Sequence, residues 1–199
     1  MATRKRSFTT IELILIPMFA ALMAIGANIT SFLVVGGVPI TLQVLFATLA
    51  GALLGSRRGA LSMIIYLLIG LVGFPVFAQF RGGLSTLISP TFGFLISFIM
   101  IAFVVGLIIE RSSKKSLQTF LIACFVGLTI SYVFGTNYMY FAYQLIADLD
   151  AITYGMAWAW MVAPLIKDIV FTIFAAVLSV RIYHTVNKNT SPLPQKVAS

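Results

Sequence analysis

The sequence has little charge and almost none of the residue types that build catalytic or metal centres. Only 9% of its 199 residues are charged, whereas soluble domains carry about 25%. It contains one cysteine, Cys124, and one histidine, His184. A single cysteine excludes an internal disulfide, and so few ligating side chains form no Cys/His cluster. We therefore expect neither a metal site nor a cofactor.

Several catalytic signatures are also missing. The chain has no G-x-x-x-x-G-K-[ST] loop, so we do not expect it to hydrolyse ATP by that route. No Ser/His/Asp set is assembled, and the apolar runs hold no pair of carboxylates for a proton relay. A membrane enzyme acting on lipids would need a catalytic cluster, commonly carboxylates with a metal. The inventory indicates a chain that binds a small solute and is not an enzyme.

Apolar residues dominate instead. They make up 60% of the chain, and the mean hydropathy is +1.06. The first apolar run, residues 11–33, is about 23 residues long, which exceeds the 7–15 typical of a signal peptide. We interpret it as a retained first span. The composition predicts a single integral membrane domain over residues 1–199.

Six apolar runs approach the length that a membrane helix needs, about 17–25 residues. The predicted spans are residues 11–33, 41–55, 59–77, 90–109, 117–145 and 154–183. The second is short, which predicts local bilayer thinning or burial against its neighbours. The last two are long, so parts of them are expected at the interface or in a partly irregular connection. The predicted fold class is all-α, a bundle of six transmembrane helices.

The distribution of lysine and arginine predicts the orientation of this bundle. With the N-terminus in the cytoplasm, eleven of the 13 Lys and Arg residues fall on the inner side. Only Arg81 and Lys167 fall on the outer side or within the membrane near the outer side. Cytoplasmic loops are enriched in these residues, so both termini are predicted to lie in the cytoplasm. The chain is predicted to lie in the plasma membrane. The basic excess suits anionic lipid head groups and gives no reason to invoke nucleic acid.

The segment between the third and fourth spans, residues 74–94, is unusually polar for its neighbourhood. It carries Arg81, the only arginine on the outer face, followed by Gly82 and Gly83. Glycines permit positive φ angles and close approach of another group. An ordinary exposed turn and a solute-binding segment both explain this pattern.

Three polar side chains are expected at membrane depth: Gln43, Lys167 and Asp168. Ionisable residues there are costly and usually face a cavity or a partner. Asp168 could accept N–H groups of a neutral ligand, and Lys167 or Arg81 could neutralise a carboxylate. A structural salt bridge, or a lysine reaching toward the outer interface, is the alternative.

Small residues repeat at one-turn spacing in the first span, at Ala20 and Ala24. In lipid such spacing lets helices approach closely. The pattern explains packing within the chain as well as packing against a partner subunit.

Residues 37–98 carry an ordered series of motifs. They are P-I-T-L-Q at 39–43, L-A-G-A-L-L-G-S-R-R-G at 49–59, G-F-P-V-F-A at 73–78, G-G at 82–83 and S-P-T-F-G-F at 89–94. In order and spacing this series closely resembles the biotin transporter BioY family. Members of that family are the substrate-binding S components of energy-coupling factor (ECF) transporters.

The resemblance implies a six-helix bundle that binds biotin near the outer face, with the loop after the third span covering the site. It also implies that the alanine surface at Ala20 and Ala24 meets a transmembrane coupling subunit, itself attached to two ATP-binding subunits. Motif position implies substrate-binding roles for Gln43, the Gln79–Gly83 segment and Asp168. The full set of expected substrate-binding residues is Gln43, Gln79, Arg81, Gly82, Gly83, Lys167 and Asp168.

The sequence departs from the family pattern in two places. The fourth-span motif begins with Ser89 and ends with Phe94, where the family has Gly and Tyr. The sixth-span pattern has a lysine three residues after the aspartate, and Phe171 stands there. Both Arg81 and Lys167 thus remain candidates for binding the carboxylate. Two other functions remain open: an S component for a different vitamin, and an ion-coupled carrier of small solutes.

Overall fold

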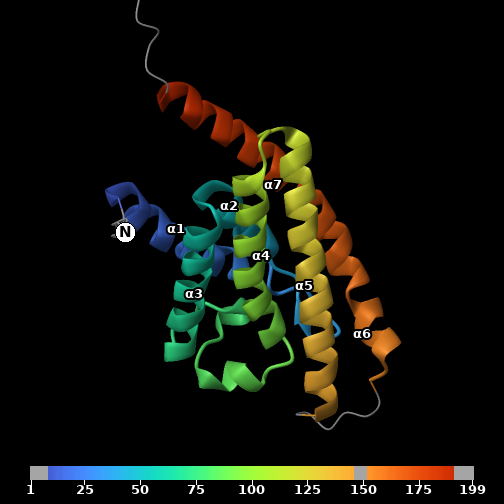
Figure 1. Ribbon diagram of the computed structural model, residues 1–199. Coiled ribbons are helices and arrows are strands. Elements are labelled where there is room, and N and C mark those ends of the chain that lie inside the picture. The colour runs from blue at the N-terminus through green and yellow to red at the C-terminus, as the bar shows by residue number, and fades with distance from the viewer. Residues whose placement is uncertain (1–8, 146–151, 191–199) are drawn as a thin grey trace, which may run out of the picture.

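The computed structural model describes residues 9–145 and 152–190, with side chains up to residue 185 in the last helix. This part of the chain is almost entirely helical (Figure 1). Its helices are α1 (Thr10–Asn28), α2 (Gln43–Leu54), α3 (Ser56–Val72), α4 (Phe92–Arg111), α5 (Leu117–Leu145), α6 (Tyr154–Trp160) and α7 (Val162–Thr190). A short antiparallel hairpin, β1 (Val34–Val35) and β2 (Val38–Pro39), joins α1 to α2. Two 3₁₀ turns, η1 (Ala78–Phe80) and η2 (Leu84–Ile88), lie between α3 and α4.

Helix α1 begins at a capping box. The Thr9 hydroxyl accepts a hydrogen bond from the Glu12 backbone N–H, and the Glu12 carboxylate accepts one from the Thr9 backbone N–H. This exchange satisfies two donors that the first helical turn would otherwise leave unpaired. Glu12 also forms a 2.6 Å ion pair with Arg58 near the start of α3. The same end of α1 is thus fixed to α3.

Glycines allow the backbones of α2, α3 and α4 to pack in direct contact with one another. A side chain at Gly51 would collide with the carbonyl group of Ala102 on α4, and one at Gly106 would collide with the backbone of Ser56. Gly51, which lies in the second predicted span, therefore serves a contact within this chain. Glu110 of α4 reinforces the junction, because its carboxylate accepts hydrogen bonds from both the backbone N–H (2.8 Å) and the hydroxyl (2.7 Å) of Ser56.

The connections lie at opposite ends of the bundle. In Figure 1 the α3–α4 connection and α6 lie at one end, and the α4–α5 turn lies at the other. The α3–α4 connection starts at Gly73, the residue after α3, whose φ of 117° lies in the left-handed region. The polar segment singled out in the sequence is therefore a compact structure at one end of the helices.

Four helices are long and apolar enough to cross a membrane. They are Thr10–Asn28, Phe92–Arg111, Leu117–Leu145 and Val162–Thr185; α2 is a shorter apolar helix. The described chain is that of a multi-pass membrane protein. The prediction of all-α structure is confirmed at this level.

The last predicted span, residues 154–183, is not one continuous helix. It is divided at Met161 into α6 and α7. The cause is Pro164, which lies in the first turn of α7. In a continuous helix the proline ring would collide with the carbonyl of residue 160, four positions earlier, whereas in a first turn it is tolerated. The break therefore falls just before the proline.

Candidate substrate-binding site

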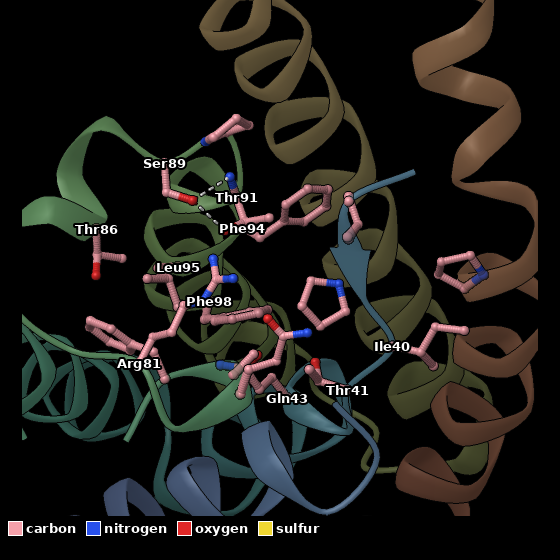
Figure 2. A pocket seen from close by; sticks show the side chains of 18 of the residues that line it. Ile40, Thr41, Gln43, Arg81, Thr86, Ser89, Thr91, Phe94, Leu95 and Phe98 are labelled. Carbon is pink, nitrogen blue, oxygen red and sulfur yellow. Dashed lines mark hydrogen bonds between the residues drawn. The ribbon is translucent and has the colours of Figure 1, made fainter. Parts of the chain in front are cut away.

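A cavity of about 750 Å³ opens among the N-terminal part of α2, the α3–α4 connection, α4, α5 and α7. This volume lies within the roughly 300–1,000 Å³ usual for small-molecule sites. Figure 2 shows Thr41, Gln43 and Arg81 bordering the space together with Ser89, Thr91 and Phe94. Polar and apolar side chains thus face one space from segments far apart in the sequence.

A buried ion pair forms one wall of this cavity. The Lys167 ammonium lies 2.7 Å from Oδ1 of Asp168, which is only 4% exposed. The Tyr132 hydroxyl donates a 2.7 Å hydrogen bond to Oδ2 of the same carboxylate. Lys167 also donates to the backbone carbonyl of Thr41, just before α2. The cluster joins α5 and α7 to the segment before α2. Whether the pair also binds a ligand stays a prediction.

Gln43, the first residue of α2, is the second polar feature of the cavity. It is 4% exposed, and its amide nitrogen donates a 3.0 Å hydrogen bond to the Tyr66 hydroxyl. That hydroxyl donates in turn to the Val76 carbonyl, also at 3.0 Å. The Gln43 side-chain oxygen accepts no hydrogen bond from the residues that the structure describes. It is therefore available as an acceptor.

The segment from Phe77 to Arg81 forms a tight turn at the cavity rim. The Phe77 N–H donates a 2.9 Å hydrogen bond to the Arg81 carbonyl, which closes the turn. Between them Gln79 and Phe80 have φ angles of 61° and 55°. Such angles are rare outside glycine and cost about 1–3 kcal/mol each. Contacts around the turn must compensate for this strain.

Phe77 is one such contact. Its side chain is 3% exposed, and its ring packs edge-on against Tyr66 with centroids 5.5 Å apart. Because Tyr66 also bonds Gln43, the turn and the second polar feature share one buried support. Gln79 and Arg81 line the cavity beyond this anchor.

Six of the seven side chains and glycines predicted to bind substrate line the cavity. They are Gln43, Gln79, Arg81, Gly82, Lys167 and Asp168. Gly83 does not line it. Its backbone N–H instead donates a 2.7 Å hydrogen bond to the Gly70 carbonyl, which fixes the segment to α3. A side chain at Gly82 would collide with the carbonyl of Phe74. Gly82 thus permits close approach of backbone to backbone. Whether the six bind a substrate stays a prediction.

Many cavity residues were not predicted from the sequence, and two of them hold the ion pair. Tyr132 and Thr41 contact the ion pair directly. Tyr132 lies in a long apolar run next to Ser131, where a tyrosine is hard to distinguish from packing. Thr41 contributes only its backbone carbonyl, for which a sequence carries no signal.

The two alanines predicted to meet a partner subunit lie on the inner side of α1. Ala20 is 5% exposed within the core, and Ala24 is half-buried against it. The exposed side of the helix instead carries Met18, Ala21 and Ile25. The partner contact at Ala20 and Ala24 stays a prediction.

Comparison with known proteins now relates this geometry to a family. The model of the BioY family matches residues 1–188. A protein named BioYB from Bacillus subtilis (strain 168) is 43% identical over 190 residues, covering 94% of each chain. The chain belongs to the BioY family. The biotin transporter BioY of Thermotoga maritima is 37% identical to this BioY family member over 171 residues, covering 86% of this chain and 95% of the relative.

A solved structure has the same fold as this BioY family member. It is the crystal structure at 2.1 Å of the S-component for biotin from an ECF-type ABC transporter. The TM-score is 0.69, with 89% of this chain and 95% of that chain covered. The two are 21% identical, so the likeness concerns the fold alone and assigns no role to the residues of this site.

Proposed function

We propose that this chain is the biotin-binding S component of an ECF-type ABC transporter and takes up biotin across the plasma membrane. The observation that carries the proposal is the cavity of about 750 Å³, with a buried Lys167–Asp168 pair in its wall, in a member of the BioY family. Relatives named as biotin transporters cover most of the chain.

The chemistry of biotin matches the groups around the cavity. Its ureido ring offers two N–H donors, for which the Asp168 carboxylate and the Gln43 side-chain oxygen are acceptors. Its sulfur ring and alkyl chain are apolar and suit the side chains of Phe94 and Phe98. Its carboxylate requires a cation, and Arg81 is the better candidate. Lys167 is already neutralised by Asp168, whereas Arg81 forms no ion pair within residues 9–145 and 152–185.

The proposal includes partner subunits: a transmembrane coupling subunit and two ATP-binding subunits. The chain has no phosphate-binding loop of the G-x-x-x-x-G-K-[ST] type, so ATP hydrolysis is assigned to the partners. We assign the contact with the coupling subunit to α1, on its exposed side next to Ala20 and Ala24. The exposed Ala21 and Ile25 flank them on the same helix.

We further propose six membrane crossings with both termini in the cytoplasm. The four long apolar helices would supply four of these crossings, and α2 and α3 would supply the other two. A new cysteine at the exposed Ser85 should react with a membrane-impermeant maleimide on intact cells, and one at the exposed Ser113 should react only after lysis. The native Cys124 is buried and gives little background. Labelling of both positions on intact cells would contradict this orientation.

Calorimetry on the detergent-purified protein tests the function. Biotin should bind with high affinity, while thiamine and riboflavin should give no heat of binding. If another vitamin binds and biotin does not, the chain is an S component of different specificity. Uptake by cells that lack every ECF coupling and ATP-binding subunit would instead favour a carrier that works alone.

A further inference from the structure

Asn28, at the C-terminal end of α1, is fully engaged although it does not line the cavity. Its side chain is 8% exposed. Its oxygen accepts a 2.7 Å hydrogen bond from the Phe80 backbone N–H. Its nitrogen donates to the Ala24 carbonyl at 2.9 Å, within α1, and more weakly to the Val76 carbonyl at 3.5 Å. One amide thus links α1 to both sides of the Phe77–Arg81 turn.

The bond to Phe80 falls where the turn is most strained. Gln79 and Phe80 are consecutive residues with positive φ, and neither is glycine. This conformation persists only when its surroundings determine it. Without Asn28, the partly buried hydrogen bond of the Phe80 N–H would be lost, and the two residues would relax toward negative φ. Gln79 and Arg81, which line the cavity, would then change direction.

We propose that Asn28 is a positioning residue for substrate binding: it holds the Phe77–Arg81 turn so that Gln79 and Arg81 face the ligand. The consequence is a coupling between α1 and the cavity. Ile25 on the outer side of α1 is 50% exposed. A contact there that displaces the helix would reach the ligand through the hydrogen bonds of Asn28.

The first test follows the turn itself and needs no ligand. Hydrogen–deuterium exchange of the purified protein should show faster exchange of residues 77–83 in Asn28→Ala and in Asn28→Leu. The leucine variant fills the volume, so it separates the lost hydrogen bonds from a cavity. Ser62→Ala is the matched control, because it removes a buried 2.6 Å bond from α3 to the Ile16 carbonyl of α1. It should leave exchange at residues 77–83 unchanged.

The second test measures biotin affinity and rests on the proposed function. Loss of the bond and misplacement of the turn should weaken biotin about tenfold in Asn28→Leu, whereas Ser62→Ala should bind as the wild type does. In an Arg81→Ala background the same Asn28 substitution should have a much smaller effect on affinity, since residues that act through one another are not additive.

The outcomes are distinguishable. Unchanged exchange at residues 77–83 in both Asn28 variants overturns the proposal. Faster exchange with unchanged biotin affinity also overturns it, because Asn28 would then only stabilise the turn. An equal loss of affinity with and without Arg81 contradicts the route through the turn. If the wild type does not bind biotin, the proposed function fails, while faster exchange would still support the hold of Asn28 on the turn.

Discussion

Changing Asp168 to asparagine should abolish tight biotin binding and lower the melting temperature of the purified protein by about 6–12 °C. Asp168 is 4% exposed, and its carboxylate forms an ion pair with the Lys167 ammonium at 2.7 Å. Removing one partner of a buried pair leaves the other charge uncompensated, at a cost of about 3–5 kcal/mol. Because the Lys167 side chain is still 20% exposed, we expect a cost of about 3 kcal/mol.

The double variant Lys167→Met/Asp168→Asn separates stability from ligand binding. Replacing both partners of a buried pair is often nearly neutral, and asparagine still offers an oxygen to the Tyr132 hydroxyl. The melting temperature should therefore largely recover, whereas biotin affinity should not. A double variant that binds biotin as tightly as the wild type would show that neither side chain contacts the ligand.

Glu12→Gln is the matched control for the loss of an ion pair. Glu12 pairs with Arg58 at 2.6 Å, but these side chains keep 17% and 41% of their exposure. Exposed pairs contribute about 0–1 kcal/mol, and glutamine can still accept in the capping box. Thermal unfolding of this variant should therefore change little. If Glu12→Gln lowers the melting temperature as much as Asp168→Asn does, the burial of an ion pair does not determine its contribution to stability.

The polar residues at membrane depth were predictable from sequence because they are expensive there. Gln43, Lys167 and Asp168 each interrupt an apolar run, and all three line the cavity. Their partners were not predictable. Thr41 acts through its backbone, and Tyr132 has the composition of an ordinary apolar span. Contact between distant segments leaves no local mark on either of them.

Glycine and alanine were harder to interpret, because a small residue marks close approach without saying to what. Gly83 has the freedom of a hinge in sequence, yet its N–H bonds the end of α3. Ala20 and Ala24 have the spacing of a helix contact surface, and both lie toward the chain's own core. The motif predicts that something comes near, and only the packing of the other helices determines which face is already occupied.

Pro164 shows the same limit for helix boundaries. A proline in an apolar run is compatible with a kinked continuous helix and with the first turn of a new one. The local sequence does not decide between them. The tertiary contacts of Lys167 and Asp168, three and four residues later, require a helix whose first turns lie at the cavity. The break before Pro164 places them there.

Arg81→Ala should weaken biotin roughly 10- to 150-fold and biotin amide far less. The reason is that a hydrogen bond to a charged group contributes about 1.5–3 kcal/mol, and only the acid form carries the anion. Arg81 borders the cavity, and its guanidinium forms no ion pair with the residues that the structure describes. Competition binding with biotin and its amide, measured on the same preparation, gives the two affinities.

Two further variants decide whether the cation is Arg81 or Lys167. Arg81→Lys keeps the charge at the rim and should restore part of the preference for the acid, though not the forked geometry of a guanidinium. Lys167→Met should lower stability, because it leaves the buried Asp168 charge without its cation, but the ratio between acid and amide affinities should survive. If that ratio disappears in Lys167→Met and persists in Arg81→Ala, the carboxylate is bound inside the bundle at α7. The arginine of the Phe77–Arg81 turn would then have no part in recognising the anion.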